Sequence, residues 1–177
     1  MSTTSQVLKQ AKQEVLSGAD RRTVFEKYQS QFPKPLKLAT VISNIPKGPI
    51  PPLARVLNIV LIVLLFLAAL SKAIAVLAIL SDAPAVPAIL GVLLSIALPV
   101  IFAIAAIKWE GQVYLMLPLL CLLGILRSWM KNPALDAAID TFFLLAIAGV
   151  AVAIKLIVFP NIGFRGVKKD ASGQYVF

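Results

Sequence analysis

Four charged residues are the side chains in this sequence with the clearest capacity for chemistry. Arg127, Lys131, Asp136 and Asp140 lie at the end of one apolar stretch and the start of the next. The two basic residues are four positions apart, as are the two acidic ones, so each pair shares one face of a helix. If these helices run antiparallel, the pairs face each other across the turn. The pattern predicts an ion-pair cluster at a membrane boundary or, in an oligomer, a pore mouth or proton path. We favour the ion-pair cluster, because carboxylates at a helix start are stabilised by the helix dipole.

A second group of side chains, near the N-terminus, predicts a surface for a protein partner or for lipid head groups. It follows Asp20, a residue suited to cap a helix. Its members are basic or aromatic: Arg21, Arg22, Phe25, Lys27 and Tyr28. The aromatic residues have a second interpretation, as the core of a small domain, and this is the one that we favour. A helix-turn-helix is disfavoured because the helices on either side of Ser17 and Gly18 are very short, so we do not expect nucleic acid as a partner.

The residue types that usually carry catalysis are scarce in this chain. It has no histidine and a single cysteine, Cys121, so the commonest general base and the commonest metal ligand are missing. No glycine-rich phosphate loop, nucleophile elbow or zinc-binding helix motif is present in the sequence. We therefore expect a protein that is not an enzyme and that holds no metal and no cofactor.

The composition indicates that a bilayer surrounds most of the chain. Of its 177 residues, 59% are hydrophobic and only 14% are charged, with a mean hydropathy of +0.90. A soluble domain has about a quarter of its residues charged. A water-soluble fold of this size still needs a polar surface, and too few polar residues are available to make one.

The chain divides into three regions. Residues 1–52, here called the head, are polar and basic, contain short helical patterns and end in a proline-rich linker. Residues 53–159 hold four apolar segments, at about 56–80, 87–107, 113–130 and 138–159. The third is the weakest, because its apolar run ends at Arg127, short of the ~17–25 residues that a spanning helix needs. Residues 160–177, here called the tail, predict a hairpin that pairs 164–168 with 174–177.

Short connections between the apolar segments predict an antiparallel bundle of four transmembrane helices. The expected fold is thus an all-α membrane protein with a small helical head and a short polar tail. The head side would carry 14 of the 17 basic residues. Because basic residues accumulate on the cytoplasmic side, we expect both termini to be cytoplasmic in a bacterial inner membrane. The net charge of +9 is then explained by this bias and by anionic lipids rather than by nucleic acid.

Two stretches of the sequence resemble small four-helix bacterial inner-membrane proteins of uncharacterised function. One runs from Ala11 through Phe25 to the segment 38–46, and the other joins the 159–161 motif Phe-Pro-Asn to the closing residues 175–177. The resemblance implies a short cytoplasmic head, four membrane helices and a polar tail, and it implies no activity. Colicin immunity proteins and membrane components of phage-defence systems are similar in layout alone.

These observations lead to two functional expectations. The first is a non-enzymatic inner-membrane protein that acts through lipid contacts or through a cytoplasmic protein partner of residues 1–52, as a homo-oligomer or alone, in a defence, immunity or envelope role. The alternative is a subunit of a small oligomeric channel or transporter, motivated by the charged cluster of Arg127, Lys131, Asp136 and Asp140.

Overall fold

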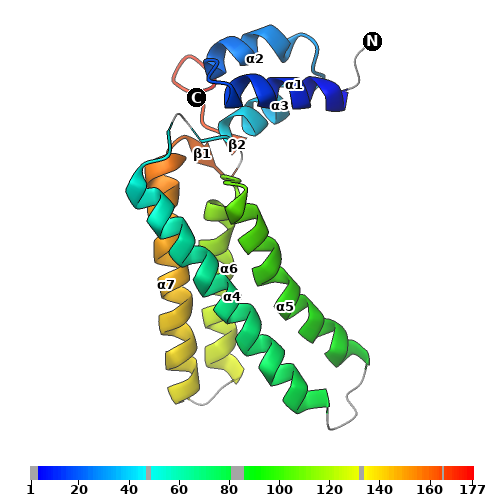
Figure 1. The fold of residues 1–177 in the computed structure, drawn as a ribbon, viewed down its shortest axis with the longest axis vertical. Coiled ribbons are helices and arrows are strands. Elements are labelled where there is room, and N and C mark those ends of the chain that lie inside the picture. Colours follow the sequence, from blue (N-terminus) through cyan, green and yellow to red (C-terminus); the bar gives the residue numbers. More distant parts are fainter. Residues whose placement is uncertain (1–3, 47–48, 81–85, 132–133, 165) are drawn as a thin grey trace.

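The computed structural model describes residues 4–46, 49–80, 86–131, 134–164 and 166–177. The side chains of 75–80, 86–92 and 131 lie outside this description. Within the described residues the chain is mostly helical, with two very short strands, which confirms the all-α prediction. Figure 1 shows two parts, a bundle of long helices and a compact head at one end of it.

The bundle consists of α4 (Pro52–Leu80), α5 (Val86–Ile107), α6 (Val113–Lys131) and α7 (Ala134–Val158). Short connections join consecutive helices, and each helix runs in the opposite direction to the one before it (Figure 1). The main pairs are α4 with α5 and α6 with α7, and contacts between α4 and α7 join the two pairs. The bundle core contains small and branched residues from all four helices, among them Leu61, Ala103, Leu117 and Ala151.

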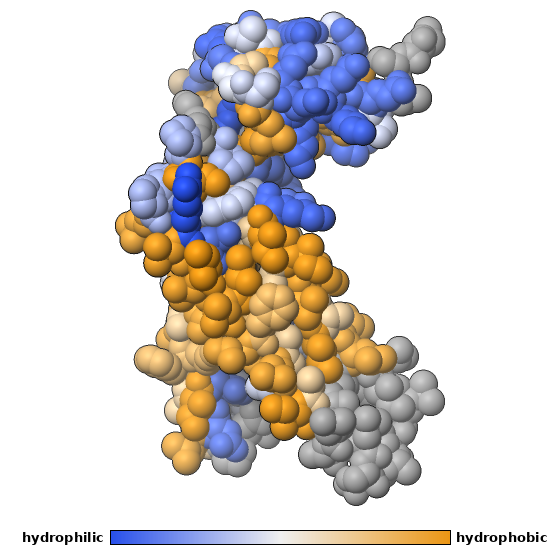
Figure 2. Space-filling view, viewed as in Figure 1, coloured by the Kyte–Doolittle hydropathy of each residue, from blue (hydrophilic) through white to orange (hydrophobic). Residues whose placement is uncertain are grey.

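Three helical stretches in the described residues are long and apolar enough to cross a membrane: Pro52–Ile74, Val113–Met130 and Ala134–Val158. The third predicted segment is among them, because its helix continues past Arg127 for another turn. The part of α5 that is described for side chains, Leu93–Ile107, is a shorter apolar helix. Large apolar side chains are exposed along all four helices, and Figure 2 shows them as a continuous hydrophobic surface below a hydrophilic head. This chain is therefore a membrane-embedded protein in contact with the lipid bilayer.

The observed helices begin earlier than the predicted segments at two places. Helix α4 starts at Pro52 rather than near residue 56, and α7 starts at Ala134 rather than near residue 138. Pro52 is the first residue of its helix. Proline is favoured there because its fixed φ suits a helix and because an N–H at this position would have no partner within the helix. Asp136 and Asp140 therefore lie inside α7, whose first turn contains Asp136.

The head is a three-helix unit with its own apolar core. It contains α1 (Thr4–Leu16), α2 (Arg21–Gln29) and α3 (Pro35–Ser43). Asp20 is the N-cap of α2, as predicted, and its carboxylate accepts from the backbone N–H groups of Arg22 and Thr23. The buried apolar residues of the three helices form one cluster with Phe32 of the α2–α3 connection: Val7, Ala11, Val15, Val24, Phe25, Tyr28, Leu38, Ala39 and Ile42.

The tail leaves the end of α7 and returns to the head. Strands β1 (Ile162–Gly163) and β2 (Gly166–Val167) form a minimal antiparallel pair. Beyond them, Lys169 pairs with Tyr175 across a turn that begins at Asp170. Val167 belongs to the buried cluster of the head, and Tyr175 and Phe177 pack against that cluster. The tail therefore packs against the apolar core of the head.

Candidate functional site

The predicted charged cluster lies at the distal end of the bundle, the end away from the head, where α6 meets α7. The Ser128 hydroxyl donates to the Asp140 carboxylate at 2.7 Å. One residue further along, the Trp129 indole N–H donates to the Thr141 hydroxyl at 2.9 Å. The Thr141 hydroxyl in turn donates to the carbonyl of Ala137. These bonds connect two antiparallel helices at matching positions, so this end of the bundle contains a polar clamp between α6 and α7.

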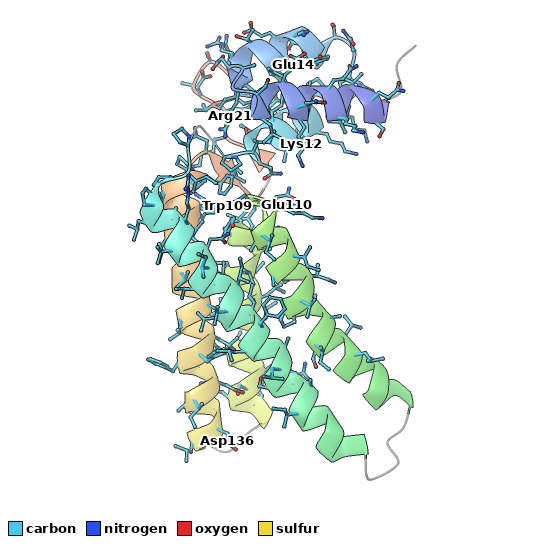
Figure 3. The ribbon with its side chains drawn as sticks, viewed as in Figure 1. Lys12, Glu14, Arg21, Trp109, Glu110 and Asp136 are labelled. Atoms are coloured by element: carbon cyan, nitrogen blue, oxygen red, sulfur yellow. The ribbon has the colours of Figure 1, made fainter. Side chains whose placement is uncertain are left out.

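The four predicted members of the cluster have different environments. Asp140 is partly buried and reaches across to α6, whereas Arg127 and Asp136 are exposed. Figure 3 shows Asp136 at the extreme distal end of α7. Lys131 is the last residue of α6, and its side chain lies outside the described residues. The residue that holds Asp140 is Ser128, which the charge pattern did not single out. Its small polar side chain within a mainly apolar helix was the available signal.

The opposite end of the bundle, called here the proximal end, contains a buried polar node. The Asn58 amide donates to the carbonyl of Ala106 at 3.0 Å, and the Tyr114 hydroxyl donates to the Asn58 Oδ1 at 2.9 Å. The Tyr114 oxygen is also 3.2 Å from the same carbonyl. Both side chains are buried, so this node joins α4, α5 and α6 where water cannot replace a lost partner.

An aromatic layer covers this node on the head side. The Tyr114 ring stacks on Phe159, with centroids 5.5 Å apart, and lies 6.3 Å from the Trp109 ring. Gly111 approaches this layer closely, because a Cβ at that position would lie 2.9 Å from the Phe159 ring and 2.6 Å from the Ile162 side chain. Its backbone N–H donates to the Asn44 carbonyl at the end of α3. The α5–α6 turn therefore contacts both the head and the start of the tail.

Trp109 occupies an unusual backbone conformation in this turn. Its φ is +55°, the one positive value at a non-glycine residue in the described part of the chain. The N–H groups of Trp109 and Glu110 donate to the carbonyls of Ala106 and Ala105. This is the hydrogen-bond pattern of a Schellman motif, in which glycine is the usual residue at the left-handed position. A bulky residue there costs about 1–2 kcal/mol, and strain of this kind is frequent at functional sites.

A cavity of about 190 Å³ lies between this turn and the head. Its lining includes Lys12 of α1 and, from the α5–α6 turn, Lys108, Trp109, Glu110 and Gln112. Figure 3 shows Lys12 in the head above Trp109 and Glu110 at the top of the bundle. We call this cavity the junction pocket. Two lysines, one glutamate and a tryptophan line it together with apolar residues of the head such as Leu16 and Val41.

The predicted N-terminal surface divides into buried and exposed residues. Phe25 and Tyr28 are buried in the core of the head, which is the interpretation we favoured for them. Arg21 is also buried, and its guanidinium donates to the Ile45 carbonyl, which joins the start of α2 to the end of α3. Burial lowers the pKa of the Arg21 guanidinium, and the neighbouring Asp20 opposes that shift. Only Arg22 and Lys27 of this group are exposed, so the group as a whole is not a surface.

Even these exposed residues contact other parts of the head and tail. The Lys27 ammonium and the Tyr28 hydroxyl both donate to the Glu14 carboxylate at 2.7 Å. These two hydrogen bonds, the Lys27 one first, lower the pKa of Glu14. The Arg22 guanidinium donates to the Gln174 side chain in the tail at 2.6 Å. Beside it, the Phe25 ring meets the Tyr175 ring edge to face, with centroids 5.2 Å apart.

Among the described residues, no three His, Cys, Asp or Glu side chains come together as metal ligands. The junction pocket is one place where charged and aromatic residues from different elements come together, and the pocket between α2 and the tail, lined by Arg22, Phe25, Glu26 and Tyr175, is another. No family model, no curated protein and no solved structure matches this chain in the three comparisons with known proteins.

Proposed function

We propose that this chain is a non-enzymatic, four-span protein of a bacterial inner membrane whose head and tail are cytoplasmic. In this proposal the head acts through contacts with a protein partner or with lipid head groups, in a defence, immunity or envelope role. The observation that carries the topology is the packing of the tail on the head, through the Phe25–Tyr175 contact and the Arg22–Gln174 hydrogen bond. Two segments that pack together lie on one side of the membrane, which favours an even number of crossings and makes α5 the fourth span.

The distribution of charge supports the orientation and the role of the head. The proposed cytoplasmic side has 14 of the 17 basic residues but only five of the eight acidic ones, and the other side has three of each. The whole net charge of +9 therefore lies on the head side. Lys34 and Lys37 are exposed there, and in the described part of the chain neither side chain has an ion pair. Such lysines are available to an acidic protein surface or to anionic lipids.

Labelling of single cysteines tests the topology. In a Cys121→Ser background, Ser30→Cys reports on the head, Ser172→Cys on the tail and Asp136→Cys on the distal end. We expect an impermeant thiol reagent to label only the Asp136→Cys variant in intact spheroplasts, and all three variants after permeabilisation. Labelling of the head and the tail from opposite sides would refute the four-span proposal.

Capture of partners from native membranes tests the role of the head. We expect the variant with Lys34→Glu and Lys37→Glu to lose a cross-linked partner that the wild-type protein retains. Lys72→Glu is the matched control, because Lys72 is an exposed lysine of α4 on the distal side. If the same partners are retained by both variants, the surface around Lys34 and Lys37 is not the contact surface.

The alternative function is a subunit of an oligomeric channel or transporter. The observation that suggests this alternative is the polar distal end of the bundle, which contains Asp140. The Ser128–Asp140 hydrogen bond argues against a channel, because it engages the Asp140 carboxylate within one chain. Light scattering in nanodiscs, followed by bilayer recordings of wild type and Asp140→Asn, tests this alternative. A ring of four or more subunits with a conductance that Asp140→Asn changes would establish the channel instead.

A further inference from the structure

The junction pocket has the composition of a binding site for a phosphate group. Lys12 lines it from α1 of the head and Lys108 from the α5–α6 turn, so two elements far apart in the sequence each contribute one lysine. Both lysines are exposed, and in the described part of the chain neither makes an ion pair. Two unpaired ammonium groups beside one cavity favour an anion with several acceptor oxygens.

The pocket is also placed at the boundary of the lipid layer. Immediately before Lys108, α5 exposes three large apolar side chains on one face, Ile101, Ile104 and Ile107. Their three-residue spacing forms a stripe that leads along the helix to the pocket. Trp109 lines the pocket at the end of this stripe, and indoles favour the interface between acyl chains and head groups. A ligand with an acyl chain below and an anion above would contact all of these groups.

The strained conformation of Trp109 fits such a role. A glycine would close this Schellman motif without strain, yet the chain has a tryptophan with φ +55°. The ring is only partly buried, against Tyr114 and the bundle core, and its remaining surface faces the pocket side of the turn. Backbone strain of this kind is frequent at ligand-binding sites, and here it occurs at a residue that lines the pocket.

We propose that the junction pocket binds the phosphate of one anionic phospholipid from the head-side leaflet. Lys12 and Lys108 bind the phosphate oxygens, Trp109 lies against the glycerol region, and the acyl chains follow the stripe of Ile101, Ile104 and Ile107. Glu110 accepts a hydrogen bond from a hydroxyl of the head group, which fits phosphatidylglycerol. Because Lys12 belongs to the head and Lys108 to the bundle, the lipid also fastens one to the other. This deepens the proposed function by naming a lipid as one contact of the head.

Native mass spectrometry of the full chain in detergent, titrated with phosphatidylglycerol or phosphatidylcholine, tests the site. A basic residue near a membrane surface contributes enough to change affinity about five-fold, so Lys12→Gln with Lys108→Gln should weaken phosphatidylglycerol binding about 30-fold. The matched control is Lys9→Gln with Lys72→Gln, which also removes two exposed lysines but leaves the pocket intact. Unchanged melting temperatures without lipid establish that the variants are folded. Equal binding of both lipids, or equal loss in the control, would overturn the proposal.

Trp109 provides a direct report from the pocket. The chain has two tryptophans, so Trp129→Phe leaves Trp109 as the sole indole. We expect brominated phosphatidylglycerol to quench its emission, and the double lysine variant to lose this quenching. Inorganic phosphate and glycerol 3-phosphate form the free-anion arm of the experiment. If either competes with the lipid at similar concentrations, the site binds a soluble phosphate and the lipid assignment is wrong.

The outcomes separate this inference from the proposed function. Loss of lipid selectivity together with intact cysteine topology and partner capture would remove the lipid site and leave the function in place. Labelling of the head and tail from opposite sides would instead refute the topology on which both depend.

Discussion

The two ends of the membrane bundle are held together in different ways. At the proximal end, buried hydrogen bonds from Asn58 and Tyr114 join three helices, and an aromatic layer connects them to the tail. At the distal end, the α6–α7 pair is held by Ser128 with Asp140 and Trp129 with Thr141. Trp129 is exposed there, and so are Arg127 and Asp136.

This difference indicates where the molecule is rigid. The proximal contacts involve the buried side chains of Asn58, Tyr114 and Phe159, so their loss leaves cavities and unpaired polar groups. The distal contacts lie between two helices that also pack through apolar residues, and interhelical hydrogen bonds in membranes average only about 0.6 kcal/mol. We therefore expect the proximal end, where the head is attached, to dominate the stability of the bundle.

The largest expected effect comes from Tyr114→Ala. It removes a fully buried ring and the hydroxyl that bonds to Asn58, so the free energy of unfolding should fall by about 3–5 kcal/mol, the range for large aromatic residues. Unfolding in mixed micelles, followed by circular dichroism, measures the change. Met116→Ala is the control, because its exposed side chain faces lipid. Equal losses in both variants would show that the node is not special.

A smaller effect is expected from Gly111→Ala. The added methyl group would lie 2.6 Å from the Ile162 side chain and 2.9 Å from the Phe159 ring, so both must shift. Overpacking of this kind costs about 1–3 kcal/mol, and it should loosen the tail before it unfolds the bundle. Limited proteolysis of the tail reports this loosening. At Gly149 a methyl group would meet no atom within 4 Å, so Gly149→Ala should leave the tail protected.

Ser128→Ala is expected to change stability less than either proximal variant. It removes the donor to Asp140 at the distal end, and the free energy of unfolding should fall by about 0.6 kcal/mol and by no more than ~1.7 kcal/mol. The same micelle titration measures it. The comparison between the two ends would be reversed if Ser128→Ala destabilised the bundle more than Tyr114→Ala.

The smallest effect is a pH dependence confined to the head. Hydrogen bonds from Lys27 and Tyr28 hold the pKa of Glu14 below its ordinary value of 4.5. The stabilisation from this carboxylate is therefore fully present above about pH 4.5 and is lost as the pH falls through the lowered pKa. Hydrogen exchange of α1 and α2 should quicken in acid while α6 and α7 stay protected.

Two comparisons sharpen that measurement. Glu14→Gln should remove the acid sensitivity of the α1 peptides. Asp170, whose pKa is lowered by the hydrogen bond from the Ser172 hydroxyl, titrates separately in the tail. Acid-induced exchange that begins in α6 and α7 would contradict the assignment to Glu14.

Much of the fold was predictable because it depends on local chemistry. The apolar segments, the Asp20 cap and the basic head follow from composition and short-range pattern. The third segment was underestimated at Arg127, since a charged residue near the end of a helix does not stop the helix. For the candidate site, Arg21, Phe25 and Tyr28 were all assigned to a surface although they are buried, and a core role was anticipated only as the second interpretation of the two aromatic residues.

The sequence by itself determined that this protein lies in a membrane, is helical and is basic at one end, because hydropathy, helical period and charge are sums over neighbouring residues. Only the tertiary structure decided which distant residues meet. Asn58 and Tyr114 are separated by 56 residues, and their polarity within apolar helices gave no indication of the partner. The same is true of Lys12 and Lys108 beside one pocket. Such pairings depend on how helices with nearly uniform apolar surfaces are rotated and packed against one another. Single side chains that are far apart in the chain determine this packing.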